Sequence, residues 1–266
     1  MSAAPVYEVY AIKYAEHQRT AAANFLNGDP HDGPMPIDYF VWAIKGPERS
    51  FVVDMGFDAA TAAKRDRTLL RCPAAALAAV GIDAATVEDL VVTHLHYDHA
   101  GNFDRFPAAT FHLQDREVAY ATGRHMCHGF LNHPFDVEHV VQTVRRVYAG
   151  KVRFHDGDLE LAPGITLHRV GGHSDGLQCV RVRTRRGWVV LASDAAHFYA
   201  NIEQRRPFAI AFHVGDMLTA FQRLYALADS PEHVVPGHDP LVMARYPAPR
   251  PDLEGIVARL DVAPRP

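Results

Sequence analysis

The sequence is poor in cysteine and free of strong charge imbalance, and both properties narrow its class. Its three cysteines, Cys72, Cys127 and Cys179, are widely spaced and form no C-x-x-C pair. This pattern favours reduced thiols in a cytoplasm over a disulfide framework. The 27 basic and 31 acidic residues give a net charge of −4, which argues against a nucleic-acid partner.

Long hydrophobic runs are also missing. No apolar stretch approaches the ~20 residues of a membrane span, so we expect no membrane partner. Residues 1–8 lack both a basic segment and an apolar segment, so we expect no secretion signal. A chain of 266 residues with 48% hydrophobic residues is long enough to bury a full core, and we expect a single domain over 1–266.

Histidine and aspartate, by contrast, are concentrated in one short segment. His94, His96, Asp98 and His99 place four metal-binding side chains within six residues. The segment follows Leu90–Thr93, a short apolar run that predicts a buried strand. A sharp bend after such a strand lets several ligands converge on one point, and imidazole and carboxylate together suit zinc, iron, cobalt or nickel.

Three later residues repeat this placement. His173, Asp194 and His238 each follow an apolar run typical of a strand, with Gly or Ser beside them. The seven side chains are five histidines and two aspartates, which is too many for one tetrahedral ion. The number suits two metals that share one carboxylate.

These motifs resemble the metallo-β-lactamase superfamily and, within it, the N-acyl-homoserine lactonases. The H-x-H-x-D-H segment, the spacing to the three later ligands and the upstream Phe51–Gly56 segment carry the resemblance, which spans roughly residues 38 to 240. It implies an α/β fold, the αβ/βα sandwich of two mixed sheets with helices outside. It also implies that Asp54 supports the metal loop.

The resemblance further implies a ligand scheme and a reaction. His94, His96 and His173 would hold one divalent ion, and Asp98, His99 and His238 the second, with Asp194 as the bridge. Two ions, with zinc as the expected metal, would share a hydroxide that opens a lactone or related ester. Asp98 is the candidate that carries a proton to the leaving oxygen, the alternative being a role as ligand only.

One position departs from the lactonase pattern. Relatives commonly carry a substrate-contacting Tyr three positions beyond the bridging Asp, where this chain has His197. His197 or the nearby Tyr199 is therefore the candidate that contacts substrate, the alternative being that His197 is an ordinary core or surface residue. The stretch 120–135 is rich in aromatics and His, and we expect it to belong to a lid or pocket wall at about 115–150, with a dimer contact or a local core as the alternative. The expected partner is a small-molecule lactone or ester, with a homodimer possible.

Three functions are compatible with these residues. The first is a dinuclear lactonase or ester hydrolase. The second is another hydrolase of the fold: a thioesterase of the glyoxalase II kind shares all seven ligands, whereas the commonest class B β-lactamases carry Cys at the position of Asp194. The third is a mononuclear iron enzyme similar to persulfide dioxygenases. Metal content separates the last from the first two.

Periodicity predicts the remaining elements. We expect strands at 7–14 and 39–44, hairpins at 159–169 and 179–191, and helices at 59–70, 73–80, 114–120, 137–148 and 216–228. In the last helix we expect Met217, Leu218, Phe221, Leu224 and Tyr225 to face inward. The tail from Pro247 is rich in proline, and we expect it to lie along the surface.

Overall fold

A computed structural model describes residues 5–265 and contains two mixed β-sheets. The first sheet has the strand order β13-β1-β2-β3-β5-β6-β7, with β4 paired to β1. Neighbours are antiparallel from β13 to β3 and parallel from β3 to β7. The strands are β1 (Glu8–His17), β2 (Ile37–Lys45), β3 (Ser50–Val53), β4 (Thr68–Leu69), β5 (Asp89–Val91), β6 (Thr110–Gln114), β7 (Val152–His155) and β13 (Val257–Arg259).

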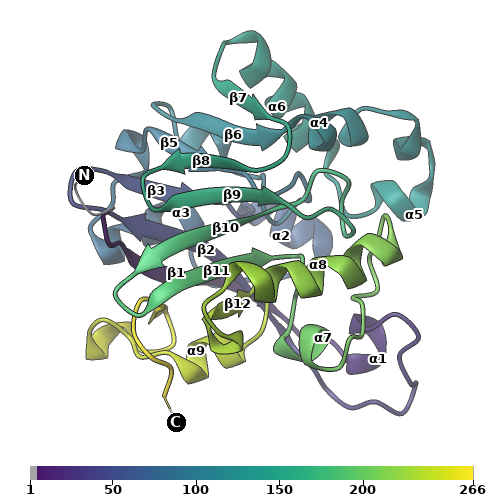
Figure 1. Ribbon diagram of the computed structural model, residues 1–266. Helices are drawn as coiled ribbons and strands as arrows, with labels where there is room; N and C mark the ends of the chain where they lie inside the picture. The colour runs from purple at the N-terminus through teal and green to yellow at the C-terminus, as the bar shows by residue number, and fades with distance from the viewer. Residues whose placement is uncertain (1–4, 266) are drawn as a thin grey trace.

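The second sheet has the order β12-β11-β10-β9-β8. Its pairs are antiparallel except for β11 and β12, which are parallel. Its strands are β8 (Leu159–Ala162), β9 (Ile165–Arg169), β10 (Gln178–Thr184), β11 (Gly187–Ser193) and β12 (Val234–Pro236). In Figure 1 the green strands β8–β11 lie in front of the purple and blue strands of the first sheet.

Helices flank the two sheets and connect their strands. They are α1 (Ala21–Asn24), α2 (Ala59–Arg65), α3 (Pro73–Ala76), α4 (Asp115–Ala121), α5 (Gly129–Asn132), α6 (Val137–Tyr148), α7 (Tyr199–Glu203), α8 (Val214–Leu227) and α9 (Leu241–Arg245). Helices α4, α5 and α6 form the crossover between the parallel strands β6 and β7, and α5 lies at the periphery in Figure 1. No helix in the described part of the chain is long and apolar enough to cross a membrane.

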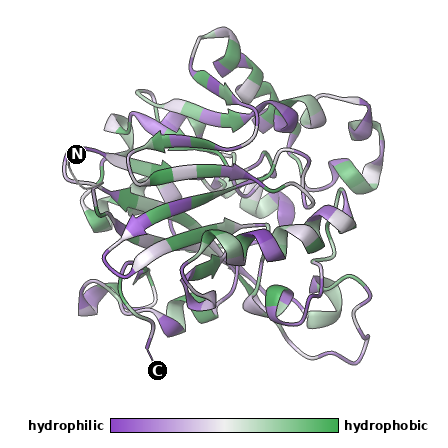
Figure 2. Ribbon diagram, viewed as in Figure 1, coloured by the Kyte–Doolittle hydropathy of each residue, from purple (hydrophilic) through white to green (hydrophobic). Residues whose placement is uncertain are grey.

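Three apolar clusters hold these layers together. Trp42 and Phe51 of the first sheet meet Val182 and Leu191 of the second in a cluster between the sheets. A second cluster lies between the outer face of the first sheet and helices that include α2 and α3, and a third lies between the second sheet and α8. Figure 2 shows the apolar residues concentrated on the strands. This helix–sheet–sheet–helix order confirms the predicted αβ/βα sandwich.

The predicted strands and hairpins are confirmed, but the first predicted helix was too long. Helix α2 ends at Arg65, and Asp66 takes a left-handed conformation with φ of 54° as its cap. The chain then pairs as β4 instead of continuing the helix to residue 70. A left-handed cap on a residue other than glycine gave little sequence signal for this end.

Two further expectations are corrected. In α8, Met217, Phe221 and Leu224 are buried, but Leu218 and Tyr225 are 40% and 37% exposed because they lie at the edge of the apolar stripe. The tail does not only follow the surface, because β13 adds an antiparallel edge strand to β1. Its strand is three residues long, too short for the alternation that identifies a strand from sequence.

Candidate metal centre

The seven predicted ligands lie together, on loops that leave the ends of four strands. The segment His94–His99 follows β5, His173 follows β9, Asp194 follows β11 and His238 follows β12. All seven residues are at most 8% exposed. The apolar runs form the strands, and the polar residues after them collect at one edge of the sandwich. The cluster therefore draws on both sheets.

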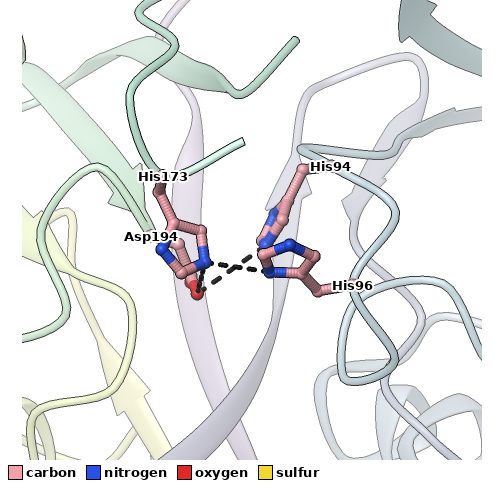
Figure 3. A group of neighbouring side chains, drawn as sticks. All are labelled: His94, His96, His173 and Asp194. Carbon is pink, nitrogen blue, oxygen red and sulfur yellow. Dashed lines mark hydrogen bonds and ion pairs between the residues drawn. The ribbon is translucent and has the colours of Figure 1, made fainter. Parts of the chain in front are cut away.

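Asp194 lies between two groups of imidazoles. Its Oδ2 is 3.1 Å from Nε2 of His173 and 3.7 Å from Nε2 of His94. Its Oδ1 is 2.9 Å from Nε2 of His238 and 3.2 Å from Nε2 of His99. Figure 3 shows the first group, in which His94, His96 and His173 point toward one another and toward Asp194. Each carboxylate oxygen thus faces one half of the site.

The second half contains Asp98 beside two of these imidazoles. Asp98 Oδ2 lies 3.6 Å from Nε2 of His99 and 3.7 Å from Nε2 of His238. The donor atoms of Asp98, His99 and His238 all lie within 4.8 Å of one another, as do those of His94, His96, His173 and Asp194. These two sets match the scheme that the resemblance implied, and a third set, Asp194, His197 and His238, meets the same distance criterion.

Backbone and side-chain acceptors fix the orientation of three rings. Nδ1 of His173 donates to Ile210 O at 2.8 Å, and Nδ1 of His238 donates to Asp38 O at 2.8 Å. Nδ1 of His99 donates to the Asp54 carboxylate at 2.7 Å. With the proton at Nδ1, a neutral ring presents a lone pair at Nε2 toward the centre. Such acceptors are the usual partners of metal-binding histidines.

This arrangement fits a bound cation. The lone pairs of His99 and His238 would face Asp194 Oδ1 at 3.2 and 2.9 Å, a repulsive contact unless a positive charge lies among them. The buried Nε2 atoms of His94 and His99 also have no hydrogen-bond partner among the described residues. Buried polar atoms are rarely left unsatisfied, so the donor set fits divalent ions.

The charge states differ between the rings. At His99 and His238 burial lowers the pKa, but nearby carboxylates, Asp194 above all, outweigh burial and raise it, so the site favours positive charge at these two rings. Burial lowers the pKa of His94 and His96 well below the usual value, which keeps these rings in the neutral, metal-binding form. Burial alone would raise the pKa of Asp194, but His197, His238 and His99 outweigh it and hold that pKa well below its usual range. The site therefore holds an anionic bridge among imidazoles.

Two buried carboxylates outside the ligand set position the metal loops. Asp54 accepts hydrogen bonds from the backbone N and hydroxyl of Thr93 at 2.7 and 2.8 Å, besides that from His99. Glu117 of α4 accepts from Leu95 N at 2.8 Å and Gly176 N at 3.0 Å, and thereby joins the His94–His99 loop to the His173 loop. Asp54 was predicted from the sequence. Glu117 was missed, since one glutamate in a helix gives no signal.

The two candidate substrate-contacting residues lie in different places. His197 is buried at the site, stacks on Phe208 at 3.5 Å between ring centroids and has Nε2 3.0 Å from Asp194 Oδ2. Burial lowers its pKa to about 3, so the ring is neutral and Nε2–H donates to Asp194. Tyr199 is not brought to the site. It packs in the cluster between the sheets, with the Arg245 guanidinium 4.0 Å from its ring.

A narrow cavity of about 60 Å³ opens onto the cluster. Of the stretch 120–135, only His133 and Pro134 line it. Phe130 is 67% exposed, whereas Phe135 packs edge-on against the His96 ring at 4.7 Å. The stretch therefore supports the metal loop at one end and lies away from the cavity over most of its length.

Several cavity residues were not singled out from the sequence. Tyr39 and Tyr97 share a hydrogen bond of 3.0 Å between their hydroxyls, and Tyr97 stands inside the ligand motif itself. In the sequence, its position between the ligands His96 and Asp98 could have identified Tyr97 as a residue of the site. The other polar side chains that line the cavity include Arg19, Arg65 and Arg67.

Comparison with known families agrees with this geometry. The sequence model of the Metallo-beta-lactamase superfamily matches residues 36–238, which include all seven candidate ligands. The chain belongs to the metallo-β-lactamase superfamily. Membership and the His/Asp cluster together support a divalent metal centre. The resemblance expected from the sequence is confirmed at the level of the family.

Curated relatives of this superfamily member include N-acyl homoserine lactonases. The chain is 34% identical over 173 residues to N-acyl homoserine lactonase AttM of Azorhizobium caulinodans, an alignment that covers 61% of this chain and 62% of the relative. It is 28% identical over 162 residues to N-acyl homoserine lactonase AiiA of Bacillus thuringiensis subsp. kurstaki, with 60% and 59% covered. The alignments thus span about three fifths of these relatives.

Solved structures of the superfamily share the fold. A quorum-quenching N-acyl homoserine lactone lactonase superposes with a TM-score of 0.74 at 21% identity, covering 91% of this chain and 95% of that one. The dizinc quorum-quenching lactonase AidC, solved with the product N-hexanoyl-L-homoserine, superposes with a TM-score of 0.68 at 14% identity, covering 90% of each chain. At these identities the likeness establishes the fold alone.

Proposed function

We propose that this protein is a dinuclear metal hydrolase that opens a lactone or a related ester. The observation that carries the proposal is the position of Asp194, whose two oxygens face the two halves of the donor set. One carboxylate shared in this way suits a pair of ions, for which we propose zinc. The lactonases among the curated relatives support ester opening as the reaction.

The proposed ligands are those named from the sequence. His94, His96 and His173 would hold one ion, Asp98, His99 and His238 would hold the other, and Asp194 would serve both. Divalent ions bound here supply Lewis acidity, which makes water nucleophilic near neutral pH and polarises an ester carbonyl. No Ser or Cys nucleophile is then required.

Asp98 is the residue we propose for proton transfer. Its carboxylate lines the cavity with Oδ2 toward His99 and His238, which leaves Oδ1 to carry a proton. Its backbone carbonyl accepts from Tyr14 OH at 2.8 Å, which fixes the turn that presents it. From there it delivers the proton to the alkoxide oxygen that leaves when the ester bond breaks.

His197 and the segment 115–150 take supporting roles in this proposal. His197 positions Asp194 through Nε2–H, since that donor is already engaged and a substrate contact would require its release. The segment 115–150 acts as the outer wall of the site, which it approaches through His133 and Pro134. We further propose a cytoplasmic protein that consumes diffusible lactones, which would be quorum quenching. A homodimer stays a prediction.

The two complete half-sites favour this function over a mononuclear iron enzyme. A thioesterase shares the same donor set, so only the substrate that is hydrolysed distinguishes it from a lactonase. The test is a panel of γ-lactones, thioesters and β-lactams, with metal analysis on the same preparation. We expect two zinc ions per chain and a kcat/KM for the best lactone that exceeds any β-lactam by orders of magnitude, because an amide nitrogen must also be protonated as it leaves.

The opposite results have definite meanings. A β-lactam turned over as well as the best lactone would contradict the proposed reaction. Thioester hydrolysis without lactone opening would assign the protein to the thioesterases. One iron ion per chain, with no hydrolysis, would contradict a dinuclear hydrolase altogether.

A further inference from the structure

Three arginines line the cavity above the metal centre, and none is paired with a carboxylate. Arg19, Arg65 and Arg67 share this cavity with the candidate ligands. Within residues 5–265, no Asp or Glu oxygen lies within 4.0 Å of their guanidinium nitrogens. Arg185, by comparison, pairs with Asp261 at 2.9 Å.

Local structure brings the three side chains together. Arg19 lies in the loop between β1 and α1, and Arg65 is the last residue of α2. The left-handed turn at Asp66 reverses the chain, so that Arg65 and Arg67 both reach the Tyr97 ring. Their guanidinium carbons lie 4.2 and 5.8 Å from its centroid. Tyr97 directly precedes Asp98, so the positive charge stands beside the reacting site.

Neutral acceptors hold these groups in place without cancelling their charge. Arg65 donates to the carbonyl oxygens of His133 and Phe135 at 2.7 and 2.6 Å. Arg67 Nε donates to Tyr97 OH at 3.0 Å, and Arg19 donates to a backbone carbonyl at 2.6 Å.

Two donors on the same groups are left unsatisfied among residues 5–265. The Nε atoms of Arg19 and Arg65 are buried without a hydrogen-bond partner in the described part of the chain. Half-buried, unpaired guanidinium groups are costly to hold, and this cost is offset when an anion binds them.

A neutral lactone offers such a cluster only uncharged carbonyl oxygens, which bind guanidinium groups less strongly than a carboxylate does. The cavity of about 60 Å³ is far smaller than the roughly 300–1,000 Å³ typical of ligand pockets, so groups beyond the scissile bond must lie at its mouth. Guanidinium groups match carboxylates in geometry and charge, and both partners gain when water is excluded. The charge at the mouth therefore selects the substituent that the ring carries.

We propose that Arg19, Arg65 and Arg67 form an anion-recognition rim, and that the preferred substrate is a lactone or ester with a free carboxylate near the scissile bond. This inference rests on the proposed ester hydrolysis and specifies its substrate class. The rim binds the carboxylate that the substrate already carries, while the ester carbonyl reaches the metal centre.

The kinetic test uses the metal-loaded protein and two matched substrates. One is a γ-butyrolactone that bears a ring carboxylate, and the other is the same lactone with a carboxamide in its place. We expect kcat/KM to be roughly 10- to 100-fold higher for the acid, the usual effect of a charge-assisted hydrogen bond. Arg19→Gln should lower kcat/KM for the acid much more than for the amide, and so remove most of this preference. Arg67→Gln should do the same, and Arg19→Lys should restore part of it.

The matched control is Arg250→Gln, which removes the same charge from an exposed ion pair with Asp252. It should leave the acid-to-amide ratio unchanged. Equal kcat/KM for acid and amide in the wild type would overturn the proposal, and would fit a rim that merely meets the carboxylate formed by the reaction. An equal loss for both substrates in Arg19→Gln and Arg67→Gln would overturn it as well.

A binding experiment tests the rim independently of the proposed reaction. The experiment is calorimetry with glutarate and with its monoamide, glutaramate. Both ligands carry one carboxylate that can bind the metals, and only glutarate carries a second one for the rim. We expect glutarate to bind roughly 10-fold tighter in the wild type and equally in Arg19→Gln. If this difference in affinity appears but no lactone is opened, the anion-recognition rim is supported and the lactonase function is contradicted. If lactones are opened but glutarate binds no tighter than glutaramate, the rim is contradicted and the lactonase function is supported.

Discussion

Asp54→Asn tests how the metal loop is positioned, because it replaces one carboxylate oxygen by an NH2 group, removes the negative charge and keeps the shape of the side chain. Asp54 is fully buried and sits at φ of 62°, a conformation that Asn tolerates well. The Asn oxygen keeps the hydrogen bond from Thr93 N. The Thr93 hydroxyl can reverse its role, since it already pairs with Ser193 Oγ at 2.9 Å. Only the contact with His99 cannot be kept as it is.

At that contact the amide places an N–H opposite the Nδ1–H of His99, which was 2.7 Å from the carboxylate. The ring relieves this clash by moving its proton to Nε2, the nitrogen that faces Asp194 and Asp98. A protonated Nε2 cannot bind a metal. We expect the metal held by His99 to bind about 10- to 100-fold more weakly, the usual effect of losing such a partner, and the other metal to be retained.

The assay is a competition between the protein and a chromogenic chelator, which gives one dissociation constant for each ion. The control is Asp89→Asn, which alters a similar carboxylate–imidazole contact, Asp89 to His112 at 2.9 Å, outside the metal centre. It should leave both constants unchanged. Two unchanged constants in Asp54→Asn would refute the assigned ring orientation, and equal weakening of both would refute the assignment of His99 to one half-site.

Three further changes probe the same site. Asp194→Asn should lose at least one metal equivalent and nearly all activity, because an amide offers one neutral oxygen; metal analysis showing two retained ions with near-normal turnover would contradict a shared carboxylate. His197→Phe should lower kcat roughly 10- to 100-fold with both metals retained, and metal loss as large as that of Asp194→Asn would instead make His197 a ligand. Glu117→Gln should destabilise the fold by roughly 1–3 kcal/mol, measured by urea unfolding, because its amide N–H meets donors that the carboxylate accepted; unchanged stability would show that the loops do not depend on it.

The sequence was sufficient to locate the candidate ligands because their signal is local. His94, His96, Asp98 and His99 occupy one turn, and His173, Asp194 and His238 each follow a strand that periodicity identifies. The ends of strands in a sandwich meet at one edge, so finding the strands brings the side chains together. The role of Asp54 was implied by the resemblance to the superfamily, which the segment Phe51–Gly56 carries.

Other features of the site and fold could be recognised only in the structure. Nothing in the order of residues distinguishes Tyr199 from His197, yet the turn into α7 sends Tyr199 between the sheets and leaves His197 on Asp194. Glu117 acts by joining two loops that lie far apart in the chain. The strand β13 depends on pairing with β1, at the opposite end of the sequence. Such contacts leave no periodic signal.

The same contrast explains why a metal motif predicts chemistry better than substrate. The ligands descend from strand ends, which the fold fixes, whereas the cavity mouth is formed by loops such as those that carry Arg19 and Arg67. A loop can replace a neutral side chain by arginine without moving any ligand. Members of one superfamily can therefore share seven ligands and one reaction while they select substrates of different charge. For this chain, we expect the guanidinium groups of Arg19, Arg65 and Arg67 to determine which of these substrates is preferred.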